Sequence, residues 1–202
     1  MNEKKNLWSF QLNTASLVLI PAAVGINYIG KLFAGLLKLP LWLDSIGTML
    51  AAFLAGPVVG ALSGLINNVI YGLTMDPISF VYALTNVGIG IAVGLLARSG
   101  KIRGVKSAIL GGVVVALVAV VISTPLNMIF WGGQTGNVWG DAVYAWCVAQ
   151  GMPALVGSAL DEVVVDLPDK IATILIAYGI FRGLPKKLTL LYQSGEKVES
   201  LD

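Results

Sequence analysis

Polar residues are rare in this chain, and the first stretch that gathers them is residues 44–68. It begins with Asp44 and ends with the pair Asn67 and Asn68, in a segment that is otherwise apolar and small. A carboxylate and amides can hold a ligand through charge and hydrogen bonds, whereas exposing them to lipid would cost a few kcal/mol each. Such side chains usually face a cavity or another helix, which makes this stretch a candidate binding site.

A second concentration of chemical groups is residues 131–151, where aromatic residues and amides alternate with glycines. We expect a mobile loop whose tryptophans offer flat faces for stacking. An aromatic belt at the level of the lipid headgroups is the alternative, although a belt does not need amides. The candidate ligand contacts here are Trp131, Gln134, Trp139 and Trp146.

The third concentration is the sequence "DLPDK" at residues 166–170. Asp166 or Asp169 beside a proline is typical of a helix start, and Lys170 can pair with either carboxylate. We interpret the cluster as a structural ion pair. A ligand-binding or gating role is the alternative.

Several kinds of chemistry are disfavoured by what the sequence lacks. The chain has no histidine and one cysteine, so the commonest general base and the commonest metal ligands are missing. It also has no G-x-x-x-x-G-K-[ST] phosphate loop for ATP hydrolysis. A net charge of +2 does not suggest a nucleic-acid surface. We therefore expect no enzyme, no catalytic or metal-binding residues and no cofactor.

The elements that must position these groups are membrane helices. Hydrophobic residues make up 56% of the 202 residues, charged residues make up 12%, and the mean hydropathy is +0.83. A soluble domain has about 45–50% apolar and about 25% charged residues. The chain is thus predicted to be an all-α integral membrane protein with six transmembrane helices. The helices are expected at about residues 13–37, 44–55, 57–73, 78–97, 107–130 and 167–184.

These helices are expected to form one membrane domain over residues 1–202. Residues 1–12 are an interfacial N-terminus, residues 13–187 form the six-helix bundle, and residues 188–202 are a polar cytoplasmic tail. With six crossings, most basic residues fall on one side, which the positive-inside rule makes cytoplasmic. Both termini then lie in the cytoplasm. The basic residues on that side are Lys4, Lys5, Arg98, Lys101, Arg103, Lys106, Arg182, Lys186 and Lys187.

This topology brings the polar residues of the first stretch toward the outer side of the membrane. Asp44 would begin the second helix there, and Asn67, Asn68 and Tyr71 would end the third. Asn86 would lie in the outer half of the fourth helix, so all of them could meet in one outward-facing pocket. Two structural alternatives stay open: Asp44 caps the second helix, and the asparagines join helices to each other.

Several segments together resemble a known family. They are the hairpin "LDSIGTMLAAFLAGPVVGALSGLINNVI", the basic link between the fourth and fifth helices, and the closing "DLPDKIATILIAYGIFRGLPKKL". Over about residues 15–187 the chain resembles the substrate-binding S components of energy-coupling factor (ECF) transporters, the vitamin importers of bacteria. The resemblance implies a multi-pass protein of the bacterial cell membrane that captures a vitamin from outside.

The resemblance also implies partners. S components dock through small residues of the first helix to a transmembrane coupling subunit, which two cytoplasmic ATPases drive. The A-x-x-x-A docking motif of many members is absent here. The small residues that remain as candidates for docking are Ala22, Ala23, Gly25, Gly30 and Ala34.

The candidate pocket offers amides, hydroxyls and aromatic faces but few cations. That mix favours a mostly uncharged ligand with many hydrogen-bonding groups over a polyanion. Among the vitamins that the resemblance implies, we expect cobalamin or another corrinoid. Pyridoxine or the hydroxymethylpyrimidine of thiamine is the alternative. A cation-coupled secondary transporter is a competing function, favoured if Asp44, Asp166 or Asp169 binds a proton or a sodium ion.

Overall fold

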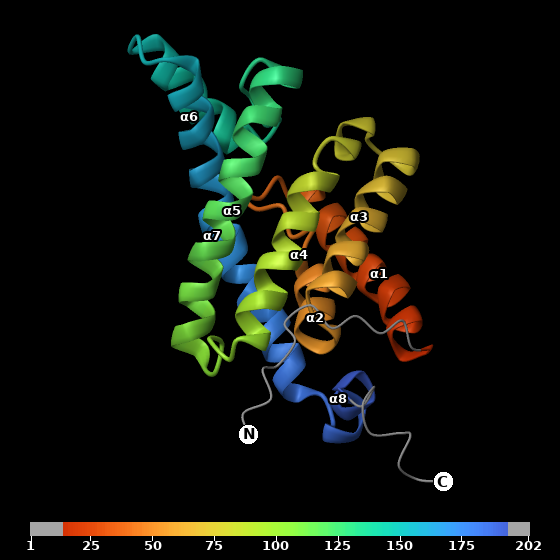
Figure 1. Ribbon diagram of the computed structural model, residues 1–202. Helices are drawn as coiled ribbons and strands as arrows, with labels where there is room; N and C mark the ends of the chain where they lie inside the picture. The colour runs from red at the N-terminus through yellow and green to blue at the C-terminus, as the bar shows by residue number, and fades with distance from the viewer. Residues whose placement is uncertain (1–13, 194–202) are drawn as a thin grey trace, which may run out of the picture.

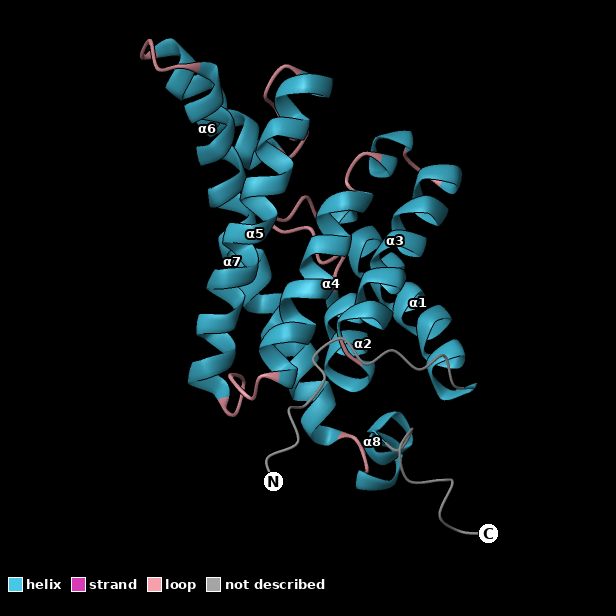
Figure 2. Cartoon of the chain, in the orientation of Figure 1, coloured by secondary structure: helices cyan, strands magenta, loops and turns pink. Residues whose placement is uncertain are grey.

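The structure is a computed structural model that describes residues 14–193, and every regular element in that range is a helix (Figure 1 and Figure 2). The prediction of an all-α chain is confirmed for this range. The expected interfacial N-terminus, residues 1–12, lies outside it. The elements are α1 (Thr14–Leu36), α2 (Ile46–Ala55), α3 (Pro57–Thr74), the short 3-10 helix η1 (Pro77–Phe80), α4 (Ala83–Arg98), α5 (Val105–Trp131), α6 (Val138–Ala149), α7 (Ala154–Gly183) and α8 (Lys186–Gln193).

Length and composition suit these helices to a membrane. Three of them, α1, α3 and α5, are long and apolar enough to cross a bilayer, and α2 and α4 are shorter apolar helices. Many large apolar side chains on α1 and α5 point outward, including Phe33 and Val121, which are 54% and 73% exposed. In water such a surface would be costly, so the helices form a bundle suited to lipid.

The bundle has two groups of helices with α2 at their junction. Helices α5, α6 and α7 pack together on one side, and α3 packs on α4 and α1 on the other (Figure 1). Helix α2 contacts α1, α3, α4 and α7, and its residues are nearly all buried. Small residues make this packing possible: a side chain at Gly47 would overlap the backbone of Ala23 in α1.

The chain departs most from expectation between residues 131 and 166. The sequence predicted a long loop there, followed by a helix at 167–184. Instead the segment forms α6 and the first half of α7, which begins at Ala154 and continues through Pro168. Proline is tolerated inside membrane helices, because neighbouring groups can satisfy the backbone that it frees. The interpretation of "DLPDK" as a helix start is therefore wrong.

Smaller corrections concern the other helix ends. The second helix begins at Ile46 rather than at residue 44, and the fourth begins at Ala83, because η1 occupies Pro77–Phe80. The expected polar tail contains the end of a further helix, α8, which packs against α2.

Three links lie at the same end of the bundle, and basic residues lie in or beside two of them, the α4–α5 and α7–α8 links. The α2–α3, α4–α5 and α7–α8 links lie at the lower end in Figure 1, whereas η1 and the α6–α7 link lie at the upper end. At the lower end, Arg98 donates a hydrogen bond to the carbonyl oxygen of Ala55 (3.1 Å) and so joins α4 to the end of α2. The α4–α5 link also contains Lys101 and Arg103.

Candidate functional site

A cavity of about 210 Å³ lies among α1, α4, α5 and α7. Its lining is rich in polar and ionisable side chains, which come from segments far apart in the sequence. The lining residues are Lys31, Trp42, Asp44, Asp76, Ile78, Ser79, Tyr82, Thr85, Asn86, Ile89, Ser123, Thr135, Gly136, Glu162, Asp166 and Lys170.

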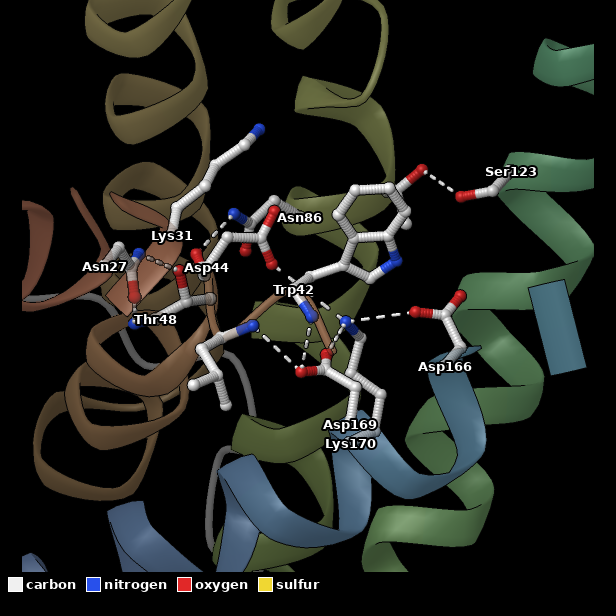
Figure 3. A network of polar contacts seen from close by, with 12 residues as sticks. Asn27, Lys31, Trp42, Asp44, Thr48, Asn86, Ser123, Asp166, Asp169 and Lys170 are labelled. Carbon is white, nitrogen blue, oxygen red and sulfur yellow. Dashed lines mark hydrogen bonds and ion pairs between the residues drawn. The ribbon is translucent and has the colours of Figure 1, made fainter. Parts of the chain in front are cut away.

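One wall of the cavity is the link between α1 and α2, residues 37–45. Buried Asp169 of α7 holds this link in place: its Oδ1 accepts hydrogen bonds from the backbone N–H groups of Trp42 (3.0 Å) and Leu43 (2.9 Å) (Figure 3). Leu43 has a φ of +53°, a conformation that L residues adopt at a cost. The two hydrogen bonds stabilise that backbone and thereby position Trp42 and Asp44 toward the cavity.

Lys170 forms the centre of an ion cluster beside this wall. Its Nζ lies 2.5 Å from Asp169 Oδ2, 3.1 Å from Asp166 Oδ1 and 4.0 Å from Asp44 Oδ1 (Figure 3). The predicted pairing of Lys170 with Asp166 or Asp169 is confirmed, and it occurs with both. Because the lysine side chain is only 2% exposed, the cluster compensates a charge held away from water.

The beginning of α2 is capped from another helix. Asn27 of α1 accepts hydrogen bonds at Oδ1 from the N–H groups of Gly47 (2.6 Å) and Thr48 (3.2 Å), and its Nδ2 donates to Thr48 Oγ1 (2.9 Å). These are the first-turn N–H groups that a cap satisfies. The alternative in which Asp44 caps the second helix is therefore wrong, and Asp44 is left to face the cavity.

A chain of hydrogen bonds forms the opposite wall. Tyr82 donates to Asn127 Oδ1, and Asn127 Nδ2 donates to Glu162 Oε1 (2.6 Å). Since the oxygen of Asn127 is already occupied by Tyr82, its amide nitrogen is turned toward Glu162. Sequence reasoning missed Tyr82, Asn127 and Glu162. The signal was present, because Asn127 is an isolated polar residue in an apolar run, and Glu162 with Asp161 forms an acidic pair between apolar residues.

The residues predicted from the first polar stretch divide into two layers. Asp44 and Asn86 line the cavity. Asn68 lies behind them: its Oδ1 accepts from Asn86 Nδ2 (2.9 Å), and its Nδ2 donates to the carbonyl of Ser79 (3.0 Å). Asn67 donates to Asn68 (3.2 Å). The asparagine pair thus joins α3 to α4 and η1, as the structural alternative proposed.

A second cavity of about 210 Å³ adjoins the first and shares Lys31, Trp42 and Gly136 with it. Two predicted residues, Tyr71 and Trp139, lie there. Trp139 Nε1 donates to the carbonyl of Lys38 (3.1 Å), so α6 touches the α1–α2 link.

The remaining predicted residues of the 131–151 stretch lie elsewhere. Trp131, Gln134 and Trp146 line neither cavity, and Trp146 is 58% exposed. The structure therefore brings only part of the aromatic stretch near the cavity. The expected mobile loop is replaced by α6.

The small residues of α1 also divide. Ala22 is exposed, and a side chain at Gly25 would meet nothing within 4 Å, so these two positions lie on an open surface. Ala23 and Ala34 are buried inside the protein. Gly30 lies directly against the backbone of Leu43, which leaves no room for a Cβ.

Comparison with known proteins gives one result. A family model described as "ECF transporter, substrate-specific component" matches residues 15–187, a range that contains every residue lining the two cavities. No curated protein and no solved structure matches the chain. Among residues 14–193, no group of three or more histidine, cysteine or acidic side chains is arranged to hold a metal ion.

Proposed function

Because the chain belongs to the family of substrate-specific components of ECF transporters, we propose that it captures a small ring-shaped vitamin or vitamin precursor in the cavity beside Lys170. Components of this family bind a substrate for a transporter and are not enzymes. The observation that carries the proposal is the cavity with a polar lining that lies between the α1–α2 link and α7.

Size supports a small ligand. Pockets for drug-sized molecules usually measure about 300–1,000 Å³, and this cavity measures about 210 Å³. A corrinoid with its amide side chains is several times larger than pyridoxine or hydroxymethylpyrimidine. The sequence analysis predicted cobalamin. The size of the cavity instead favours the alternative ligand, a small heteroaromatic ring such as pyridoxine or hydroxymethylpyrimidine.

The lining also suits such a ring. Trp42 and Tyr82 supply aromatic faces in the same cavity, and Asn86, Thr85 and Ser123 supply amide and hydroxyl groups. Aromatic faces bind a planar ring by stacking, and a few convergent polar groups fix its orientation. We propose Asp44, Asn86 and Trp42 as ligand contacts. Tyr71 and Trp139 would meet the ligand in the adjoining cavity as it enters.

We further propose that the chain crosses the bacterial membrane six times, with both termini in the cytoplasm. The crossings would be α1, α2, α3, α4, α5 and α7, and the cavity would open toward the outside. The basic residues in the α4–α5 link and beside the α7–α8 link, which lie at the same end of the bundle, support this orientation through the positive-inside rule.

The partners proposed from the family are a transmembrane coupling subunit and two cytoplasmic ATPases. The open surface at Ala22 and Gly25 supports docking through the first half of α1. Ala23, Gly30 and Ala34 are engaged in packing within the chain, so their part in docking would require a rearrangement of α1.

Uptake by proteoliposomes tests this function. The purified chain alone should bind radiolabelled ring compounds without accumulating them. Accumulation should require the coupling subunit, the ATPases and ATP. Concentrative uptake by the chain alone, driven by a proton or sodium gradient, would establish a cation-coupled secondary transporter instead.

A further inference from the structure

Two carboxyl groups of α7 are in contact in the wall of the first cavity. Glu162 and Asp166 lie one helical turn apart, both line the cavity, and a hydrogen bond joins their side chains. The two residues are 2% and 3% exposed, so the contact is shielded from bulk water. A hydrogen bond needs a donor, and an ionised carboxylate is only an acceptor. The contact therefore requires a proton on one of the two side chains.

The neighbouring charges decide which side chain carries this proton. Asp166 Oδ1 lies 3.1 Å from Lys170 Nζ, an ion pair that favours the charged form of the aspartate (Figure 3). Glu162 has no such partner, because within residues 14–193 no lysine or arginine nitrogen lies within 4.0 Å of its carboxyl group. A buried acid without a cation is more stable when it is neutral. The proton therefore belongs on Glu162.

Asn127 of α5 fixes the other end of the Glu162 carboxyl group. Tyr82 donates to Asn127 Oδ1, so the amide nitrogen of Asn127 is the atom that donates to Glu162 Oε1 (2.6 Å). Oε1 is thus an acceptor, which leaves Oε2 to carry the proton that Asp166 accepts. A single proton gives every contact of the Glu162 side chain one donor and one acceptor.

We propose that Glu162 is a positioning residue that holds one proton, donates it to Asp166, and thereby joins two walls of the cavity. A series of contacts then runs from Asn127 of α5 through this acid pair to Lys170. Asp169 extends the series to the backbone of the α1–α2 link. Loss of the proton would leave two carboxylates in contact and break the series between α5 and the ion cluster.

Other charged and titratable groups surround the acid pair. The carboxyl groups among them outnumber the two ammonium groups, which adds to the cost of a charge on Glu162. Because several of these groups can titrate, the proton has to be identified from a difference between variants. The surrounding groups are Asp161, Asp169 and Lys170 on α7, and Lys31, Asp44, Asp76, Tyr82 and Asp141 on other segments.

Thermal unfolding of the purified full-length protein in detergent, measured from about pH 5 to about pH 10, tests for the proton without any ligand. Glu162→Gln copies the protonated acid at every pH, because its amide oxygen can accept from Asn127 and its NH₂ group can donate to Asp166. The wild type should lose stability as the pH rises, since its folded state binds a proton that the unfolded chain releases. The two proteins should therefore be similar near the acidic end of the range, and Glu162→Gln should be the more stable at higher pH.

The size of the difference follows from one proton. Relative to Glu162→Gln, the unfolding midpoint of the wild type should fall by about 3–5 °C for each pH unit over which only the folded state keeps the proton. Parallel pH profiles of the two proteins would overturn the inference, whatever ligand the protein binds.

Two further variants serve as controls. Asp76→Asn removes one charge from the same cavity and keeps an oxygen that can accept from the N–H of Ile78 (3.1 Å). It should keep the pH profile of the wild type. Glu162→Ala removes both hydrogen bonds and should unfold at a lower temperature than Glu162→Gln at every pH. Equal midpoints of Glu162→Ala and Glu162→Gln would contradict the positioning role.

Infrared spectroscopy gives a second measurement that does not require Glu162→Gln to fold. Glu162 is the single glutamate within residues 14–193, and the chain contains three others, at positions 3, 196 and 199. Changing those three to glutamine and labelling the glutamate carboxyl carbon with carbon-13 makes the shifted band specific to Glu162. The carbonyl band of a protonated acid at neutral pH supports the inference, and a carboxylate band contradicts it.

Ligand titration connects the proton to the proposed function, on which this last step rests. If a ring compound binds, its affinity should fall with rising pH more steeply in the wild type than in Glu162→Gln. Equal pH dependence of binding would overturn the connection to capture. If no ring compound binds while the unfolding profiles differ as expected, the proposed function fails and the shared proton stands.

A bound sodium ion is the competing explanation for the contact between the two acids. Sodium chloride, but not potassium chloride, would then raise the unfolding midpoint of the wild type and leave that of Glu162→Gln unchanged. That result would contradict the shared proton. Equal effects of the two salts support it.

Discussion

Asp169 binds two partners at once. One of its carboxylate oxygens accepts hydrogen bonds from the α1–α2 link, and the other forms an ion pair with Lys170. Oδ1 accepts from the backbone of Trp42 and Leu43, and Oδ2 lies 2.5 Å from Lys170 Nζ. One buried side chain therefore connects the wall of the cavity to the ion cluster beneath it. The wall and the cluster should respond together when this residue is changed.

Replacing Asp169 tests that connection. Asp169→Asn keeps an oxygen for the backbone but turns an NH₂ group, which is itself a donor, toward the ammonium of Lys170. We expect a loss of about 3 kcal/mol in the free energy of unfolding, together with weaker ligand binding. Chemical denaturation in detergent and titration measure the two effects. The control Asp141→Asn makes the same charge change at a carboxylate that accepts from Thr135 and Gly136, away from Lys170, and should cost about 1 kcal/mol. Equal losses in both variants would contradict the role of Asp169.

A second prediction concerns Lys170 itself. Lys170→Met leaves three carboxylates near one another without a cation and should destabilise the protein by about 3–5 kcal/mol. Adding Asp166→Asn to this variant removes one of the repelling charges, so the double variant should be more stable than the sum of the two single changes implies. Additive free energies in this double-mutant cycle would show that Asp166 and Lys170 are not coupled.

The cap of α2 by Asn27 gives a third prediction. Asn27→Ala removes the acceptor for Gly47 and Thr48 and should cost about 1–2 kcal/mol of unfolding free energy. Thr48→Val is the matched control, because it removes only the side-chain hydrogen bond between the two residues. Its cost should be smaller, and a larger loss in Thr48→Val would indicate that the cap contributes little.

Orientation in the membrane is a fourth prediction. After Cys147→Ala removes the native buried thiol, a single cysteine at Ser99 should react only with a reagent applied from the cytoplasm. A single cysteine at Gln134, which is exposed in the α5–α6 link, should react only from outside. Reaction of both positions from the same side would exclude the six-crossing topology.

The sequence predicted the helical class and the positions of the apolar helices, because continuous apolar runs dominate α1, α3 and α5. It also identified Asp44 and Asn86, since isolated polar residues in apolar helices stand out. The α6–α7 hairpin was missed because the glycines of residues 131–151 suggested a loop, and Pro168 with its flanking aspartates suggested that a helix starts there. In the structure the four acidic residues of α7 are buried by tertiary packing, and Lys170 pairs with two of them, Asp166 and Asp169.

Because of that error, the cavity-lining residues that come from residues 131–166 were not predicted as such. Because residues 131–166 were expected to link two helices, Glu162 was not among the predicted ligand contacts, and Asn127 had no partner. Trp42 was missed for a different reason: within "LPLWLD" it reads as one more apolar residue, and only the hydrogen bonds to Asp169 reveal how the link is held. Long-range contacts of this kind leave no local pattern in a single sequence.

Equilibrium titration of the purified wild-type protein with hydroxymethylpyrimidine, pyridoxine and cobinamide tests the central claim most directly. The cavity of about 210 Å³ predicts saturable binding of a small ring at micromolar concentration or below and no binding of cobinamide. Asn86→Leu, which replaces a cavity-lining amide, should weaken the small ring at least about tenfold. Tight binding of cobinamide without binding of either small ring would contradict the account and restore the corrinoid prediction.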